Sequence, residues 1–478
     1  MNYRSIREMF VAILLIFFPQ LGFADFFQSD TDLIDDNTPR LSYGVAVTDF
    51  NDDGKNEFIV TGFGFSNLAL GMNDGRLMNL VRDEIFADKS RRTIGVAACD
   101  VNGDGKEELY FLNTDTFSGA KKLGDRLLSR EAQLIDMFEL TENLSKVNLF
   151  AGRSVACVDR QGNGYYGIYV SNYGGPSRLY EVDGARVDDL APGLGLDAVT
   201  GGRAVIAGHI LGSKIDIFAS NERGPNFLYH NKNGKFYERA TFYGLDDTLQ
   251  NGRGTALADV LYDGRLGIIS GNWNGFHRVY VPFQNSFVDY ATKEFKEPSK
   301  IRTVIVADFD NDGFDEIFIN NIGEPNRLFR IEENGSLKQL KLSAALESSG
   351  LGTGAAVADT NNDGVLELLI AHGETAPQPL SLFTAKISAS ARYVRFAPRN
   401  MHNAPARGAT VILKTNQRNH AKTIDAGSGY LCQMEPVAHY GLRPNEKIEK
   451  VTIRWTNGSL TSIGSINENE TLTIRQTF

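Results

Sequence analysis

Four short loops of the chain carry oxygen-bearing side chains at one shared spacing. Each loop has Asp at position 1, Asp or Asn at 3, Asp at 5, Gly at 6 and Glu at 9. Carboxylate and amide oxygens are the ligands that Ca²⁺ prefers, and the ion takes six to eight of them at about 2.3–2.6 Å. The glycine permits the sharp turn that lets these side chains converge. The four loops therefore predict about four calcium sites.

The predicted ligands are the side chains at positions 1, 3, 5 and 9 and the backbone carbonyl at position 7. The alternative is that these are four acidic turns that bind no ion. Because one five-residue pattern recurs in four separate places, the sequence favours the metal. The predicted ligands are Asp49, Asn51, Asp53, Lys55 and Glu57; Asp100, Asn102, Asp104, Lys106 and Glu108; Asp308, Asp310, Asp312, Phe314 and Glu316; and Asp359, Asn361, Asp363, Val365 and Glu367.

The EF-hand is the obvious competitor for such spacing. An EF-hand needs a bidentate Glu at position 12 and a helix on each side of the loop. In all four loops position 12 is apolar, and the flanks are runs typical of strands. The second acid stands at position 9 instead, which predicts a shorter loop within a β-hairpin.

The spacing between loops predicts a ring. Three further copies, in which the loop pattern is incomplete, begin at Asp159, Gly208 and Asp259. Seven copies therefore follow one another at a period near 50 residues. The Gly208 copy has no side-chain oxygen at positions 1, 3 and 5, and the other two have Gly at position 9; whether they bind an ion stays open. Each copy reads as four short strands, and four antiparallel strands repeated radially form a β-propeller. We therefore predict an all-β, seven-bladed propeller over residues 25–387.

The two ends of this region complete each other. The last copy supplies only three strands, whereas an additional strand is available at residues 26–34, before the first copy. We expect the closing blade to be shared by both ends. Residues 392–478 break the period and show alternating runs separated by turns, which predicts a second domain, a small β-sandwich or barrel.

Composition and the first residues indicate the compartment. Arg4 and Arg7 precede an apolar run and then small residues, which predicts a secretory signal peptide over residues 1–24 and no membrane span after its removal. The formal net charge is −10, and no basic cluster suggests nucleic acid. We therefore expect a secreted or periplasmic protein.

The three cysteines allow at most one disulfide. Cys99 and Cys157 end the first strands of neighbouring copies, but Cys99 lies one residue before its loop and Cys157 two. This offset predicts side chains that face opposite ways. We therefore expect buried free thiols, although a bond between the two is the alternative.

Several segments together resemble a known family. The chain looks like the cartilage acidic protein family, which joins integrin-α-like FG-GAP/VCBS propeller repeats to an ASPIC/UnbV domain. That resemblance implies an extracellular calcium-binding interaction or adhesion protein without established catalytic activity. The matching segments are GRSVACVD (152–159), GPNFLYHN (224–231), GRGTALAD (252–259), GNWNGFHR (271–278), RTVIVADFDND (302–312) and GSGYLCQMEPVAHYGL (427–442).

Three functions remain, one of which is a stability element with no partner of its own. Another is a non-catalytic protein that binds an unidentified extracellular protein or glycan. The aromatic-polar loop at residues 272–276 is one candidate surface, although the sequence slightly favours a blade-packing turn there. The third is an exported enzyme, for example one acting on polysaccharide, with structural calcium. Catalytic motifs are missing from the sequence, and a pairing of Ser428 with His439 lacks the strand–turn–helix context of a nucleophile. We therefore expect no enzyme activity.

Overall fold

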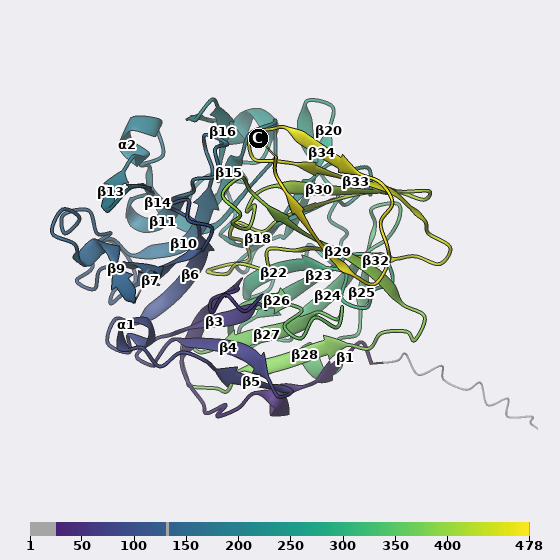
Figure 1. Ribbon diagram of the computed structural model, residues 1–478, viewed down its shortest axis with the longest axis horizontal. Coiled ribbons are helices and arrows are strands. Elements are labelled where there is room, and N and C mark those ends of the chain that lie inside the picture. Colours follow the sequence, from purple (N-terminus) through teal and green to yellow (C-terminus); the bar gives the residue numbers. More distant parts are fainter. Residues whose placement is uncertain (1–24, 131–132, 478) are drawn as a thin grey trace, which may run out of the picture.

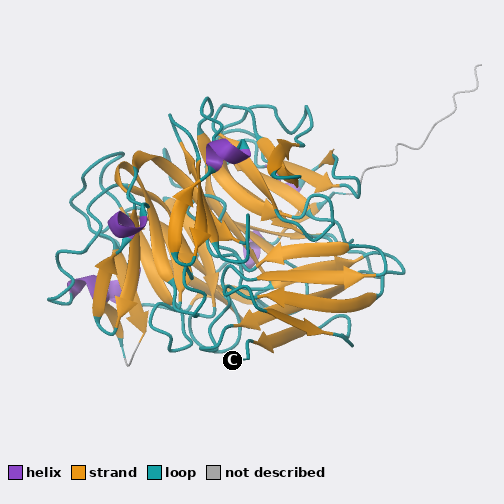
Figure 2. Ribbon diagram, turned by 90° about the horizontal axis from the view of Figure 1, so that it is seen from above, coloured by secondary structure: helices purple, strands orange, loops and turns teal. Residues whose placement is uncertain are grey.

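A computed structural model describes residues 25–130 and 133–477 of the chain. Strands form nearly all of their regular structure, as Figure 2 shows, and this confirms the all-β prediction. The predicted signal peptide lies outside the described residues. The short helices are α1 (Glu84–Ala87), α2 (Ala191–Leu194) and α3 (Ala240–Tyr243), with 3₁₀ turns η1 (Thr31–Leu33), η2 (Met137–Glu139) and η3 (Ala344–Leu346).

Seven four-stranded antiparallel blades form the propeller, and blades 3 and 4 are joined into one eight-stranded sheet by pairing between the second strand of blade 3 and the first strand of blade 4. Blade 1 is β2 (Ser42–Thr48), β3 (Glu57–Gly62), β4 (Leu68–Asn73) and β5 (Arg76–Asn79); blade 2 is β6 (Thr93–Cys99), β7 (Glu108–Asn113), β8 (Arg126–Arg130) and β9 (Leu134–Asp136); blade 3 is β10 (Gly152–Val158), β11 (Gly167–Pro176), β12 (Arg178–Asp183) and β13 (Arg186–Asp189); blade 4 is β14 (Val199–Gly208), β15 (Asp216–Asn221), β16 (Phe227–Lys232) and β17 (Lys235–Glu238). Blade 5 is β18 (Gly252–Ala258), β19 (Gly267–Asn272), β20 (Arg278–Phe283) and β21 (Ser286–Asp289); blade 6 is β22 (Ile301–Ala307), β23 (Glu316–Asn321), β24 (Arg327–Ile331) and β25 (Leu337–Leu340); blade 7 is β26 (Gly352–Ala358), β27 (Glu367–His372), β28 (Ser381–Ala385) and β1 (Phe27–Ser29).

The first strands of the blades line the central channel and close into a ring. They contact one another in the order β2, β6, β10, β14, β18, β22, β26 and back to β2. These strands are rich in glycine, alanine and threonine, because seven strands that converge on one axis leave little room for large side chains. The seven-bladed propeller is therefore confirmed.

Blade 7 is shared by the two ends of the propeller, as predicted. Strand β1 pairs antiparallel with β28, with Phe27 opposite Ala385, and Figure 1 shows the purple β1 alongside the green β28. The Phe27 side chain is buried and its ring lies 5.2 Å from that of Phe309 in blade 6. The aromatic contact anchors the closing strand to the neighbouring blade.

The last part of the chain forms two packed sheets, which we call the C-terminal sandwich. Its core includes Phe396, Tyr440 and Trp455, all buried between the sheets. The predicted small β-sandwich is thus confirmed, and it lies against one side of the ring (Figure 1). One sheet is β32 (Ala438–Leu442), β29 (Arg392–Arg399) and β35 (Thr471–Arg475); the other is β31 (Asn419–Thr423), β30 (Thr410–Thr415), β33 (Ile448–Arg454) and β34 (Leu460–Ile463).

Residues 425–435 leave the sandwich and enter the central channel; we call them the channel segment. Gly429 exchanges both backbone hydrogen bonds with Thr255 of β18, at 2.7 and 2.8 Å, and Gln433 bonds the backbone of β2 and, through its amide, Ala98 of β6. The segment therefore satisfies N–H and C=O groups that the innermost strands present to the channel. Gly427 has a φ of +130°, and a Cβ there would lie 2.6 Å from the carbonyl oxygen of Val155, so the tight fit requires glycine.

Cys99 and Cys157 form a disulfide bond, with 5.8 Å between their Cα atoms, so the prediction of free thiols was wrong for this pair. The two side chains do point to opposite faces of their own blades. Because neighbouring blades stack face to face, opposite faces of β6 and β10 are the faces that meet. Cys432, in the channel segment, is a free and buried thiol.

Candidate metal centres

Each of the four full loops connects the two innermost strands of its blade. The position-9 glutamate is in every case the first residue of the second strand, at the start of β3, β7, β23 and β27. Strands on both sides exclude the EF-hand arrangement, which requires helices. The position-6 glycines, Gly54, Gly105, Gly313 and Gly364, have φ between +83° and +90°, which confirms the turn that the sequence predicted.

Backbone N–H groups hold two of the carboxylates in place. In the first loop Asp49 accepts hydrogen bonds from the N–H groups of Asp53 and Gly54, at 3.1 and 3.0 Å. Glu57 accepts one from Phe50 at 2.7 Å through Oε2, and the equivalent bond recurs in the other three loops at 2.8–3.1 Å. The same oxygen of each glutamate is thus bound to the loop backbone, whereas the other oxygen faces the position-3 asparagine in blades 1 and 2 and Arg330 in blade 6.

The blade 6 loop gathers its carboxylates most closely. Oxygens of Asp308, Asp310 and Glu316 all lie within 4.8 Å of one another. This separation suits a shared divalent cation with ligand distances of about 2.3–2.6 Å. The donor set therefore fits calcium.

In the other three loops an asparagine stands at position 3. Asn51 donates from Nδ2 to Asp53 and Glu57, at 3.1 and 3.2 Å, and Asn102 makes the equivalent bonds in blade 2. In blade 7 Asn361 reaches Asp363 at 2.9 Å. Rotation of each amide by half a turn would present its oxygen at the same point.

The position-7 residues contribute their N–H groups to the loop. In the four loops this N–H donates to the position-5 aspartate at 2.8–2.9 Å; the donors are Lys55, Lys106, Phe314 and Val365. A role for their carbonyl oxygens stays a prediction. Burial is the largest cause of high carboxyl pKa values in these loops, raising the pKa of Glu57 to about 7 and those of Glu108 and Glu367 to about 8. Neighbouring carboxylates add to these shifts, and a bound divalent cation would offset both effects.

Arg330 is a feature of the blade 6 loop that the sequence analysis missed. It lies on β24 opposite Glu316, and its guanidinium contacts Asp312 and lies 3.4 Å from oxygens of Asp310 and Glu316. At positions 1, 3, 5 and 9 this loop has four acids where the others have three and an asparagine, so Arg330 returns the net charge of these positions to −3. The facing positions in blades 1, 2 and 7 are Gly71, Ser129 and Thr384, and an alignment of the third strands would have revealed the difference.

The C-terminal sandwich covers the propeller face that carries these loops. Gly441 donates its N–H to Asp308 at 2.9 Å, and Arg395 pairs with Asp359 at 2.8 Å, so position 1 in blades 6 and 7 contacts the sandwich. In two of the incomplete loops the aspartate at position 1 also binds the C-terminal sandwich. Thr456 donates to Asp159 at 2.6 Å and the N–H of Ala421 to Asp259 at 2.9 Å.

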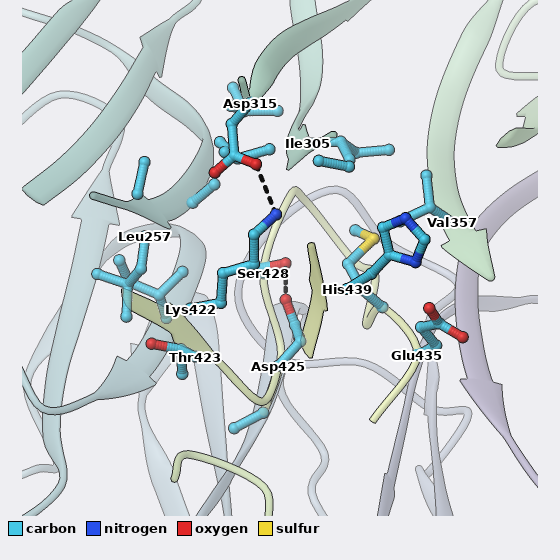
Figure 3. A pocket seen from close by; sticks show the side chains of 18 of the residues that line it. Leu257, Ile305, Asp315, Val357, Lys422, Thr423, Asp425, Ser428, Glu435 and His439 are labelled. Carbon is cyan, nitrogen blue, oxygen red and sulfur yellow. Dashed lines mark hydrogen bonds and ion pairs between the residues drawn. The ribbon is translucent and has the colours of Figure 1, made fainter. Parts of the chain in front are cut away.

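A cavity of about 90 Å³ lies between the channel wall and the sandwich (Figure 3). Its titratable side chains do not assemble the Ser428–His439 pair. Ser428 donates to Asp425, Asp315 binds Lys422 at 2.5 Å, and His439 Nε2 lies 2.6 Å from Asn311 Oδ1. Each of these groups has a structural partner, so the side chains in this cavity serve packing and the domain interface.

Comparison with known proteins agrees with this architecture. A family model described as FG-GAP-like repeat matches residues 49–111 and 308–370, and one described as ASPIC and UnbV matches residues 400–477. Within the described residues, no helix has the length and apolar character needed to cross a membrane. The crystal structure of BBS1N in complex with ARL6DN covers 73% of this chain and 95% of that chain, at 12% identity and a TM-score of 0.44, which is too slight a likeness to inform the fold.

Curated relatives match over most of the chain. Cartilage acidic protein 1 of Mus musculus is 44% identical over 468 residues, covering 90% of this chain and 72% of the relative. The Homo sapiens protein is 44% identical with 90% and 71% coverage, and the Xenopus tropicalis protein 43% with 89% and 72%. The chain therefore belongs to the cartilage acidic protein family.

Proposed function

We propose that this protein is an exported calcium-binding interaction protein without catalytic activity, which binds about four Ca²⁺ ions and presents a surface to a protein or glycan. The observation that carries the calcium assignment is the shared loop geometry, closest in Asp308, Asp310 and Glu316. Four loops with one donor pattern, one turn and one set of backbone bonds support the same ligand in each.

The position of the loops supports a stabilising role for the metal. Blades 6, 7, 1 and 2 are consecutive around the ring, and they flank the closure made by β1. The loops of blades 2, 6 and 7 also contact the C-terminal sandwich, through Arg407 to Glu107, Gly441 to Asp308 and Arg395 to Asp359. Bound calcium would therefore strengthen the ring closure and the domain interface together.

The opposite face of the propeller supports an interaction role. Loops on that face carry large apolar side chains with high exposed fractions, and such side chains are typical of binding surfaces when they gather on one face. The residues are Phe117 (64%), Val199 (66%), Phe242 (71%), Leu249 (92%) and Phe276 (54%).

Calcium titration by calorimetry on residues 25–478, with thermal melts in calcium and in chelator, tests the metal assignment. We expect about four sites and a higher melting temperature in calcium. Asp53→Asn should remove one site, whereas Asp52→Asn is the matched control, because Asp52 is adjacent in the same loop but pairs with Lys106 at 2.9 Å. Absence of binding, or equal effects of the two variants, would contradict the proposal.

The second test addresses catalysis. The purified protein in calcium should release no reducing ends from polysaccharide substrates. Release that Ser428→Ala or His439→Gln abolishes would instead identify an exported enzyme with structural calcium.

A further inference from the structure

Four consecutive blades place an arginine near the start of the innermost strand. These are Arg153, Arg203, Arg253 and Arg302, and each lies where the strand register shifts at a β-bulge. A bulge re-aims the side chain that it carries. All four line one cavity together with Tyr430 of the channel segment, where Arg203 Nη1 lies 3.5 Å from the Tyr430 hydroxyl and Arg302 lies 5.8 Å from the ring centroid. The arginines thus converge on one point.

Around this point lies a cavity of about 490 Å³, which we call the arginine pocket. The metal loops follow the ends of the innermost strands, whereas these arginines lie near the starts, so the pocket is at the opposite mouth of the channel. Aromatic rings form part of its wall. Arg302 and Arg253 lie 4.7 and 5.2 Å from the centroid of Trp273, and Arg203 lies 5.5 Å from that of Phe117.

The arginines are buried with only partial charge compensation. Their exposed fractions are between 2% and 9%. Glu222 pairs with Arg203 and Arg253, and Glu374 pairs with Arg302. Even when the half-buried Asp115 on the pocket wall is included, four positive groups face three carboxylates.

Arg153 has main-chain partners in place of a carboxylate. It donates to the carbonyl oxygens of Gly152 and Phe117. The Nε atoms of Arg253 and Arg302 are buried and, among the described residues, have no hydrogen-bond partner. Burial, followed by the charge of Arg203, lowers the pKa of Arg253 to about 10. Burial opposes ionisation of Tyr430, yet the four guanidinium groups hold its pKa below the usual value.

A buried excess of positive charge is costly unless an anion offsets it. Guanidinium groups bind carboxylate, sulfate and phosphate through paired N–H donors, and a cavity of this size is within the range of small-molecule sites. We propose that the arginine pocket binds a small organic anion through its carboxylate, sulfate or phosphate group, with the rest of the ligand against the aromatic wall.

Calorimetry with sodium sulfate, acetate and benzoate, at constant ionic strength set with sodium chloride, tests this proposal. We expect sulfate and benzoate to bind, and benzoate to bind more tightly than acetate because its ring can contact Trp273. Arg153→Gln should weaken binding about tenfold or more. The control is Arg178→Gln, because Arg178 also lies over an aromatic ring, Phe150 at 5.6 Å, but outside the pocket.

The variant Glu222→Gln provides an independent test of the same proposal. It removes an internal competitor for Arg203 and Arg253, so anions should bind several-fold more tightly. Failure of all three anions to bind would overturn the proposal, as would affinities unchanged by both Arg153→Gln and Glu222→Gln. If Arg153→Gln does not fold, an unchanged anion affinity in Glu222→Gln is by itself enough to overturn the proposal.

Discussion

Arg395 and Asp359 form a buried ion pair, with 2.8 Å between Nη1 and Oδ2, that joins the C-terminal sandwich to the blade 7 metal loop. Their side chains are 2% and 0% exposed, and Glu435 binds the other guanidinium nitrogen at 2.6 Å. A predicted metal ligand is therefore also part of the interface between the two domains. The proposed calcium site and the docking of the sandwich therefore share one carboxylate.

Removal of this guanidinium should destabilise the protein strongly. Arg395→Ala leaves two buried carboxylates without their partner, which costs on the order of 3–5 kcal/mol. Lys414→Ala is the control, because its pair with Glu449 is about half exposed and such pairs contribute at most about 1 kcal/mol. Thermal melts in calcium measure both variants. Equal melting temperatures would show that the buried pair does not hold the interface.

Arg330 should set the calcium affinity of the blade 6 loop. Arg330→Gln makes the net charge of the predicted ligand positions and residue 330 more negative, from −3 to −4, so we expect roughly tenfold tighter binding at one site. The same variant should be less stable than wild type in chelator, since four carboxylates then lack a cation. Arg327 lies on the same strand, but its guanidinium donates to main-chain carbonyls of another loop. The control variant Arg327→Gln should therefore leave both the calcium affinity of the blade 6 loop and the stability in chelator unchanged.

Three buried histidines should make the calcium-loaded protein sensitive to acid. Burial lowers the pKa of His209 and His277 to about 3 and that of His420 to about 4. The folded state therefore binds these protons more weakly than the unfolded state, whose histidines titrate near pH 6.5. Their contribution is complete above about pH 6.5 and is lost as the pH falls toward 4.

Melting temperatures between pH 7 and 4 in saturating calcium measure this effect. His420 lies 2.9 Å from Asp315 at the domain interface, and His420→Gln should flatten the profile. His230→Gln is the control, since that side chain is partly exposed. A wild-type profile that stays level down to pH 4 would contradict the assignment.

The disulfide should contribute substantially to stability, because Cys99 and Cys157 are separated by 58 residues. A loop of that length corresponds to about 4 kcal/mol in the chain-entropy account. The double variant Cys99→Ala/Cys157→Ala should melt well below wild type, and peptide mapping without reductant should recover the crosslink. Cys432 should resist maleimide in the folded protein, because burial raises its pKa to about 11. Labelling of Cys99 or Cys157 in unreduced folded protein would show that the bond is absent.

The sequence was informative where the chemistry is local. A metal loop is complete within nine residues, so its pattern, its turn and its flanking strands were readable in order. The same holds for the blade period and for the strand that closes the ring. Arg330 lies outside the loop but at a fixed place in the repeat, and a comparison of equivalent strands would have found it.

Long-range contacts carried no such signal. The channel segment meets Val45, Ala98 and Thr255, which are separated from it by more than 170 residues. Its distinctive residues marked the family without showing where the segment lies. The cysteine offset was read correctly, but its meaning depended on how blades stack.

The channel segment also has a consequence for how the protein can be divided. The strand that seals the ring is β1, at residues 27–29, and the segment that fills its axis is residues 425–435. Division of the chain at residues 388–391 would leave a propeller whose central channel is lined by unpaired peptide groups. The separated sandwich would carry the channel segment without the strands that it pairs with. We therefore expect the propeller and the sandwich to fold as one cooperative unit, because the peptide groups that line the channel are paired only when residues 425–435 are in place.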